Sequence, residues 1–430
     1  MGGLIPQLPQ VIAWETTRAC NLACVHCRAE AQYHPDPGQL TTQEGFRLID
    51  QISELSKPIL ILSGGDPLLR QDIFELAAYG TKKGLRVVMS PNGTLLTPEV
   101  VERIKMAGVS RISVSLDGSS PEVHDSFRQA AGSFKAAVRG LTYARQGNLS
   151  FQINTTVTRR NLHDLSSMLN TVVDLDAVTW DVFMLVPTGR GKIEDEVTPQ
   201  EYEEVLNWIH EVSRTAPIRI KVTCAPHYMR IVRQKAKERR DSGRDSQHPI
   251  SYSKRFGSET RWANPISSVD NYFQAHPSCC SDSDGFEPIA RSDDLGSTLK
   301  SFFGSLKSVS SEQENGRNAG ASAHQSFRRG CLAGTGFCFV SHIGDVQPCG
   351  YLNLIAGNTR RQPFGEIYLE SELFRNLRDV SRLGGKCGYC EYRMICGGCR
   401  ARAYGVQGSY LAEEPYCIYQ PRKGEKNSRL

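Results

Sequence analysis

The 430-residue sequence has no apolar run near the roughly 20 residues that a membrane-spanning helix needs. Its N-terminus lacks a basic segment followed by an apolar one, and Pro6 stands where a myristoylated Met-Gly chain carries Ser or Thr. It also lacks a long basic block, and its formal net charge is only +5. We therefore expect a cytoplasmic protein with no membrane span, no secretory signal and no nucleic-acid partner.

Cysteine, in contrast, is abundant, with 14 residues. Without a secretory signal, so many cysteines argue against a disulfide scaffold and favour thiolate ligands in a reducing compartment. They are also clustered, because three lie between residues 20 and 27 and eight lie between residues 331 and 417. Clustering of this kind favours metal ligation over cysteines scattered in a core.

The first half of the chain alternates short apolar runs with helical patterns. Thr41 with Glu44, and Thr198 with Glu201, have the spacing of N-terminal capping boxes. The predicted strands lie at 11–17, 58–65, 86–93, 111–118, 151–159 and 177–187. Apolar strands that alternate with helices form a parallel sheet covered by helices. The sequence thus predicts an α/β fold built from six βα units.

Polar, glycine-containing segments end three of these strands, at residues 64–67, 90–93 and 115–118. They could be ordinary turns between a strand and a helix. In parallel sheets, however, ligands collect at the carboxyl ends of the strands. The repetition at the same end of successive strands favours one shared ligand.

Cys20, Cys24 and Cys27 follow the first predicted strand with the spacing C-x3-C-x2-C. Three thiolates can hold three irons of a [4Fe–4S] cluster, which leaves the fourth iron without a protein ligand. A metal needs an open position in order to bind a substrate, whereas a fully ligated metal is structural or carries electrons. The spacing therefore predicts a cluster that binds a small molecule.

This cysteine motif and the Gly-Gly-Asp-Pro segment at 64–67 resemble the radical S-adenosylmethionine (SAM) enzymes, over about residues 11–215. The resemblance implies a partial (β/α)6 barrel in which the three thiolates hold the cluster and SAM binds its open iron. Asp66 departs from the glutamate that the family has there. The SAM-binding residues that the resemblance implies are Gly64, Gly65, Asp66, Ser115, Asp117 and Arg128. For Arg128, an exposed helix charge is the alternative.

The C-terminal cysteines form a second motif, Cys387-x2-Cys390-x5-Cys396-x2-Cys399. Paired C-x2-C motifs are also typical of structural zinc sites, which is the alternative. The whole layout resembles the SPASM extension of radical SAM enzymes, over about residues 331–420. That resemblance implies one auxiliary [4Fe–4S] cluster on Cys331, Cys338, Cys349 and Cys399. It implies a second on Cys387, Cys390, Cys396 and Cys417, although one cluster instead of two stays open.

We expect four regions along the chain. Residues 1–220 would form the radical SAM barrel and residues 331–420 the SPASM-type iron–sulfur domain. Between them, 221–330 would be a bridging segment that includes a Ser- and Gly-rich, disordered insertion at about 235–329. Residues 421–430 would be a tail.

Several further segments, such as "KVTCAPHY" and "GGCRARAYGVQGSYLAEEPYCIYQP", resemble the porphyrin-modifying branch of these enzymes, closest to its haem b-forming members. The resemblance implies oxidative decarboxylation of two propionates of iron-coproporphyrin III to vinyl groups. It also implies an electron donor such as a ferredoxin or flavodoxin. No catalytic side chain is assigned.

A substrate with four carboxylates needs fixed cations. The group that we predict for this role is Arg18, Arg28, Arg190 and Lys192. His227 and His342 are candidates for an axial contact with the substrate iron, but we favour a structural role for both.

Three other functions compete with haem formation. The nearest is another porphyrin reaction, such as removal of acetate side chains from didecarboxysirohaem. The second is peptide modification, which many SPASM enzymes perform. The third is a non-enzymatic zinc or iron–sulfur module, which would leave the βα units and the open three-cysteine loop without a purpose.

Overall fold

The computed structural model describes residues 8–242 and 330–422. All six predicted strands are present, and a seventh, β7, follows them at the edge of the sheet. The seven parallel strands are β1 (Val11–Glu15), β2 (Ile59–Ser63), β3 (Arg86–Met89), β4 (Ile112–Ser115), β5 (Phe151–Val157), β6 (Thr179–Met184) and β7 (Arg219–Thr223). The sequence analysis missed β7 because its residues, RIKVT, include two cations and half-exposed side chains that suit an edge.

Three C-terminal strands extend the same sheet, in the order β10-β9-β8-β1-β2-β3-β4-β5-β6-β7. They are β8 (Phe337–Val340), β9 (Asp345–Gln347) and β10 (Gly357–Asn358). β8 runs parallel to β1, from the pair Val11 and Phe337 to the pair Trp14 and Val340. The predicted hairpin, with its turn at Gly344, is confirmed by the antiparallel pairing of β8 and β9. The cysteine-rich region is therefore built directly onto the first barrel strand.

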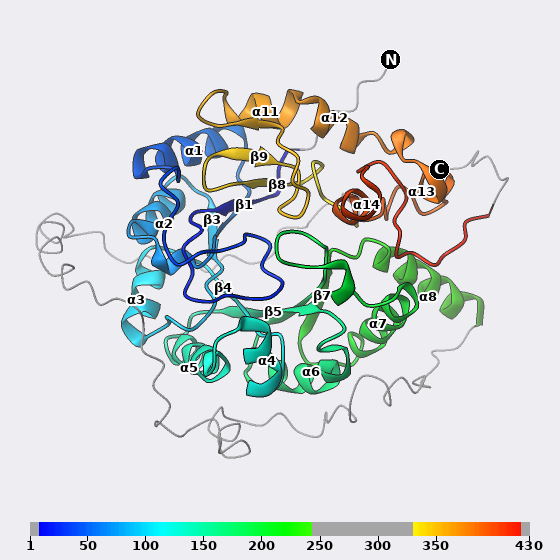
Figure 1. Cartoon of the computed structure of the whole chain (residues 1–430), viewed down its shortest axis with the longest axis horizontal. Helices are drawn as coiled ribbons and strands as arrows, with labels where there is room; N and C mark the ends of the chain where they lie inside the picture. Colours follow the sequence, from blue (N-terminus) through cyan, green and yellow to red (C-terminus); the bar gives the residue numbers. More distant parts are fainter. Residues whose placement is uncertain (1–7, 243–329, 423–430) are drawn as a thin grey trace, which may run out of the picture. The chain divides into compact units, whose positions relative to one another are not determined.

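The helices that alternate with strands β1 to β7 lie outside the curved sheet, and the segment 16–41 lies over the middle of the sheet in the view of Figure 1. These helices are α1 (Thr42–Leu55), α2 (Ile73–Lys82), α3 (Pro98–Met106), α4 (Pro121–Arg128), α5 (Ser133–Gln146), α6 (Leu165–Asp174), α7 (Pro199–Val212) and α8 (Tyr228–Ser242). The C-terminal ones are α11 (Phe364–Glu370), α12 (Glu372–Arg378), α13 (Gly385–Tyr389) and α14 (Arg400–Gln407). Short 3-10 turns occur at Pro67–Leu69, Leu162–Asp164, Ile193–Asp195 and Val380–Arg382.

Helix α8 extends to Ser242, into the first residues of the segment predicted as a disordered insertion from 235. The start of that insertion was therefore placed too early, because the helix continues with a Lys235–Glu238 pair at i,i+3 spacing. The remainder of the predicted insertion, with Cys279 and Cys280, lies outside the described residues.

The main core lies between the sheet and the surrounding helices. Ile12 and Trp14 of β1 are fully buried, and α1 packs directly over Trp14. Gly45 permits this approach, since a Cβ at that position would lie 2.8 Å from the Trp14 ring. The predicted capping box is confirmed at the start of α1, where the Thr41 hydroxyl accepts from the Glu44 amide at 3.3 Å. Local signals thus start the helices, and burial holds them against the strands.

None of the described helices is long and apolar enough to cross a membrane.

The second capping box, at the start of α7, can be tested by mutation. The Thr198 hydroxyl accepts from the Glu201 amide, and Glu201 accepts in return from the Thr198 amide at 2.8 Å. We expect Thr198→Ala to lower the free energy of unfolding by about 1 kcal/mol. Thr215→Ala is the matched control, because Thr215 is exposed beyond the same helix; its effect should stay within about 0.5 kcal/mol. Equal losses in urea unfolding of the two variants would contradict the capping role.

Candidate active site

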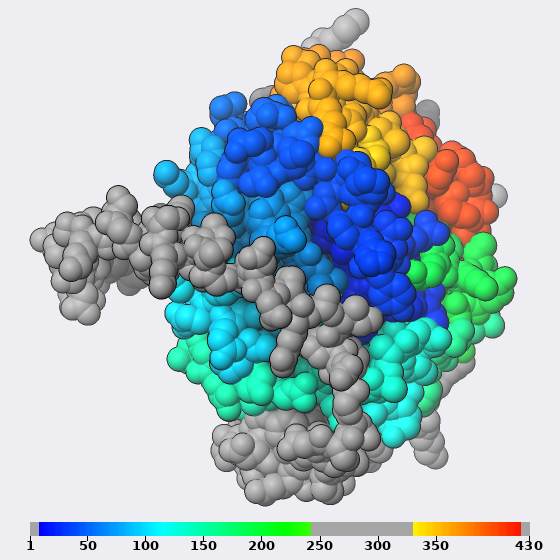
Figure 2. Space-filling model, turned by 60° about the vertical axis from the view of Figure 1, so that its left-hand side comes forward, coloured from blue at the N-terminus to red at the C-terminus, as the bar shows by residue number. Residues whose placement is uncertain are grey.

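The three N-terminal thiols lie in the loop after β1 and are packed together with Leu22 and Ala31. Cys20 and Cys24 are 6% and 7% exposed. The loop is closed by a hydrogen bond of 2.8 Å from the Cys20 amide to the Gln32 carbonyl. Figure 2 shows this N-terminal segment, coloured blue, at the surface between the orange C-terminal elements and the cyan and green later part of the barrel. The structure thus brings the three predicted ligands into one site.

Gly64 and Gly65 allow the loop after β2 to approach the cysteine loop. A Cβ at Gly64 would lie 2.5 Å from the Thr17 carbonyl oxygen, and one at Gly65 would lie 2.3 Å from that of Ala19. The close contact is bridged by backbone hydrogen bonds from Gly65 to Thr17 (2.8 Å) and from Asp66 to Ala19 (2.7 Å). A side chain at either glycine would separate the two loops.

Asp66 is fully buried and connects three loops. Its two carboxylate oxygens accept from the amides of Leu68 and Asn92, each at 2.8 Å. Burial raises the pKa of Asp66 to about 6. The Asn92 side-chain nitrogen lies 3.9 Å from the Cys20 sulfur. Sequence analysis singled out the 90–93 segment but not Asn92 itself, whose contact with Cys20 depends on the folding of both loops.

Arg128 lies at the end of α4 and is buried, not exposed as the alternative held. One terminal nitrogen of its guanidinium is 3.5 Å from the Cys24 sulfur, and the other is 2.5 Å from an Asp117 oxygen. Its Nε has no hydrogen-bond partner among the described residues. Burial alone would raise the pKa of Asp117, but Arg128 and His26 outweigh it and lower this pKa. Asp117 therefore holds Arg128 in place beside the thiols.

Two further residues, Ser115 and His26, lie near Asp117 in the chain or in space. Ser115 is half-buried at the end of β4, beside Asn154 of β5. The Nε2 of His26 is 3.5 Å from Asp117, and its ring packs edge-on against Phe127. Burial lowers the pKa of His26 to about 4, so this histidine is neutral at pH 7.

The chemistry of these residues fits an iron–sulfur cluster with an anionic ligand. Burial and the neighbouring Asp66 raise the pKa of Cys20 to about 12, so the thiolate form requires a nearby positive charge such as a metal cluster. The Ala31 amide points at the Cys27 sulfur at 3.4 Å, as amides do around thiolate ligands. The buried, unpaired Nε of Arg128 is a donor suited to a carboxylate.

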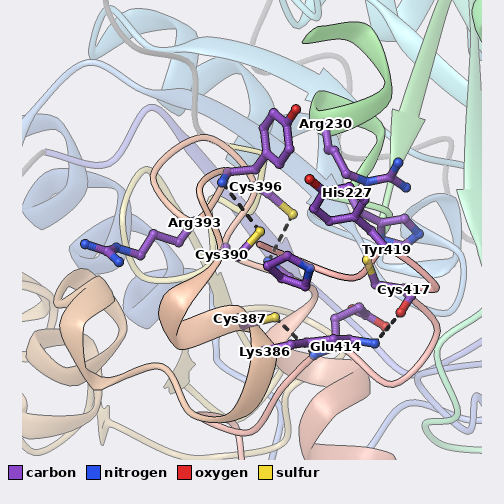
Figure 3. A pocket seen from close by; sticks show the side chains of 14 residues that line it. His227, Arg230, Lys386, Cys387, Cys390, Arg393, Cys396, Glu414, Cys417 and Tyr419 are labelled. Carbon is purple, nitrogen blue, oxygen red and sulfur yellow. Dashed lines mark hydrogen bonds between the residues drawn. The ribbon is translucent and has the colours of Figure 1, made fainter. Parts of the chain in front are cut away.

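A second set of thiols lines one pocket in the C-terminal region, and Figure 3 shows the four sulfur atoms around a common space. The set is Cys387, Cys390, Cys396 and Cys417. Backbone amides point at three of the sulfurs: Glu414 at Cys387 (3.3 Å), Tyr392 at Cys390 (3.4 Å) and Gly398 at Cys396 (3.4 Å). The structure therefore groups the cysteines predicted for the second auxiliary cluster.

The remaining predicted quartet is only partly brought together. Cys349 and Cys399 belong to one packed cluster, and the Cys331 thiol is close enough to act on both electrostatically. Cys338 lies elsewhere, in the main core beside Ile12. Across residues 8–242 and 330–422, no three histidine, cysteine or carboxylate side chains are placed as the ligands of a single metal ion.

The two candidate axial histidines differ in their surroundings. His342 is buried between carboxylates, with Nδ1 3.0 Å from Glu15 and Nε2 3.3 Å from Asp36, so its predicted structural role is confirmed. His227 lines the pocket of the Cys387 thiol set, and neither of its ring nitrogens has a partner among the described residues. Burial lowers the pKa of His227 well below its usual value, which makes the ring neutral.

Three of the four cations predicted to bind the substrate carboxylates already contact other groups of the protein. Arg28 forms an ion pair with Glu15 and stacks over Phe339. Arg190 donates to the carbonyls of Cys24 (2.9 Å) and Ala31 (3.0 Å), so it braces the cysteine loop. The other two, Arg18 and Lys192, are more exposed, and Arg18 also contacts Glu15.

Two parts of the chain match known families. Residues 14–172 match the radical SAM superfamily, and residues 331–400 match the SPASM iron–sulfur cluster-binding domain. The chain is 44% identical to the AdoMet-dependent heme synthase of Methanosarcina barkeri, over 96% of this chain and 98% of that protein. It is also 44% identical to the AdoMet-dependent heme synthase of Nitratidesulfovibrio vulgaris, over 96% and 93%. A third relative, the Fe-coproporphyrin III synthase of M. barkeri, is 28% identical over 95% and 87%.

Solved structures share the fold. Streptococcus suis SuiB bound to S-adenosylmethionine matches with a TM-score of 0.61 at 14% identity, over 96% of this chain and 78% of that one. The anSMEcpe structure with bound AdoMet matches with a TM-score of 0.56 at 15% identity, over 95% and 93%. At such identities the likeness concerns the arrangement of elements.

Because Gly65 lies so close to the cysteine loop, adding a single methyl group at this position should disturb the N-terminal site. Gly65→Ala should separate the loop after β2 from the cysteine loop, at a cost of about 1–3 kcal/mol. We expect less iron at the N-terminal site and weaker SAM binding, measured by iron content and calorimetry after anaerobic reconstitution. Gly365→Ala is the control, because a Cβ there would meet only ordinary contact, 3.8 Å from Leu55. If both variants bound iron and SAM equally, the close approach would be irrelevant to the site.

Proposed function

We propose a function for this chain on the premise that it belongs to the radical SAM superfamily, within the family of the AdoMet-dependent heme synthases. It is a radical SAM enzyme with [4Fe–4S] clusters, SAM as cofactor and a SPASM domain. Its substrate in our proposal is iron-coproporphyrin III, of which two propionates become vinyl groups to give haem b. The 44% identity to a heme synthase, along nearly the whole of both chains, carries this proposal.

The N-terminal site has the groups that SAM chemistry requires. Cys20, Cys24 and Cys27 would hold three irons of the cluster, and the open fourth iron would bind SAM. Arg128 would receive the SAM carboxylate through its unpaired Nε, since its terminal nitrogens are already held by Cys24 and Asp117. Asp117 orients the guanidinium by accepting a hydrogen bond from one of its terminal nitrogens.

When bound, the reduced cluster and SAM supply a 5′-deoxyadenosyl radical that abstracts a hydrogen atom from the substrate. For each propionate the hydrogen comes from the carbon next to the ring, and loss of carbon dioxide then forms the vinyl double bond and releases one electron. Two propionates would consume two SAM molecules. The thiol sets of the C-terminal domain would hold the acceptor of the released electrons.

The proposed reaction also determines the partners. An electron donor, such as a ferredoxin or flavodoxin, would reduce the N-terminal cluster. We place this reaction in the cytoplasm, where a reducing environment protects the clusters. Among the four cations considered for the substrate, Arg18 and Lys192 are the more exposed and thus the better candidates for reaching its carboxylates.

The substrate can be tested directly. We expect the anaerobically reconstituted protein, given SAM, a strong reductant and iron-coproporphyrin III, to form a monovinyl species and then haem b. Mass spectrometry would follow both porphyrins together with 5′-deoxyadenosine. Cleavage of SAM without change in this porphyrin would contradict the proposed substrate and favour didecarboxysirohaem or a peptide. A Cys24→Ala variant should produce no deoxyadenosine.

The proposed role of Arg128 gives a second test. Arg128→Lys keeps the positive charge that pairs with Asp117, but it removes the planar guanidinium and with it the Nε donor. Hydrogen bonds to charged groups contribute about 1.5–3 kcal/mol, so we expect SAM to bind about 10- to 150-fold more weakly. Arg145→Lys is the control, since Arg145 is a surface residue 3.6 Å from the exposed Asp176. Unchanged SAM affinity in Arg128→Lys would exclude the carboxylate contact.

A further inference from the structure

Cys224 follows β7 directly and was left without a role by the sequence analysis. It packs in the same cluster as Cys349 and Cys399. Two residues later, Pro226 touches the segment that holds Cys331, because a Cβ at Gly330 would lie 2.7 Å from the Pro226 carbonyl oxygen. The loop after β7 therefore reaches the three thiols of the first predicted auxiliary cluster.

The electrostatic surroundings of Cys224 agree with this position. The thiols of Cys349, Cys399 and Cys331 all lie close enough to interact electrostatically with that of Cys224. Four thiols gathered in this way suit a bound iron cluster, because the iron stabilises thiolates.

The backbone of Cys224 is held in an unfavourable conformation. Its φ is +62°, in the left-handed region that residues with a side chain rarely adopt. Two buried groups hold it there, since Arg402 and Tyr202 both donate to the Cys224 carbonyl at 3.0 Å. Strain that the surrounding structure maintains in this way is typical of functional positions.

Cys338, which the family resemblance implied as a ligand, faces the other side of β8. Its neighbour Phe339 lies under the Arg28 guanidinium, on the side of the cysteine loop. Successive side chains of a strand point to opposite faces, so Cys338 points away from that loop. It is fully buried, and it contributes with burial to raising the pKa of Tyr368, on α11, to about 12.

We infer that Cys224 is the fourth ligand of the first auxiliary cluster, together with Cys331, Cys349 and Cys399, and that Cys338 is a core residue. This cluster is then fully ligated by thiolates. It has no open iron for the substrate, so it serves electron transfer. Its ligands come from both the barrel and the C-terminal region. The inference does not depend on which substrate the enzyme uses.

Iron content tests the inference when the N-terminal cluster is removed. In a background of Cys20→Ala, Cys24→Ala and Cys27→Ala, the full chain should retain roughly eight irons, for two [4Fe–4S] clusters. Adding Cys224→Ala should lower the iron to about half and remove one of the two EPR signals of the reduced protein. Adding Cys338→Ala, the matched control, should leave both the iron and the EPR signals unchanged.

A second variant separates loss of a ligand from misfolding. Cys224→Gly removes the thiol but suits the positive φ, so the backbone should keep its conformation. We expect it to lose the same iron as Cys224→Ala, with an unchanged far-ultraviolet circular dichroism spectrum. Full iron content in either variant at residue 224 would overturn the inference, and so would loss of iron from Cys338→Ala. Neither readout requires SAM or a porphyrin, so failure here is distinct from failure of the proposed reaction.

Discussion

The buried guanidinium of Arg402 connects the barrel to the cysteine-rich region, and much of the site depends on it. It is fully buried, donates to the Leu185 and Cys224 carbonyls and pairs with Glu196 and Glu414. Burial of such a charge is costly unless every partner is present, and removing one partner typically costs about 3–5 kcal/mol. Glu414 in turn accepts from the Cys399 amide at 2.6 Å, and its own amide points at the Cys387 sulfur. One cation thus orients groups beside both sets of C-terminal thiols.

The continuous sheet explains why the thiol sets can work together. Because β8 pairs with β1, the C-terminal strands begin beside the strand that leads into the N-terminal cysteine loop. Two further loops connect the barrel to these sites. Arg190, in the loop after β6, donates to the N-terminal cysteine loop, and Cys224, after β7, packs among the C-terminal thiols. The N-terminal cysteine loop and the C-terminal thiol sets therefore adjoin the same sheet.

Local patterns predicted much of this arrangement, and long-range contacts decided the rest. The six strands, the capping box at Thr41 and the hairpin at Gly344 depend on residues close in sequence, so periodicity and spacing identify them. The N-terminal thiols were identified by spacing for the same reason. Arg128 was recognised as a candidate, but its burial depends on Asp117 and on a loop about a hundred positions earlier. Arg402 was not identified, and Asn92 was not distinguished within the 90–93 segment, because their contacts exist only after folding.

The sequence by itself determined the chemistry: which thiols exist and in what spacing. It also determined the α/β class, since the alternation of apolar strands and helices leaves few other arrangements. Tertiary structure alone decided which thiols share a site. Only the packing of β7 and β8 brings Cys224 to Cys349 and Cys399, near Cys331, and leaves Cys338 in the core. The reason is geometric, because a side chain's partners depend on the face of the sheet from which it projects.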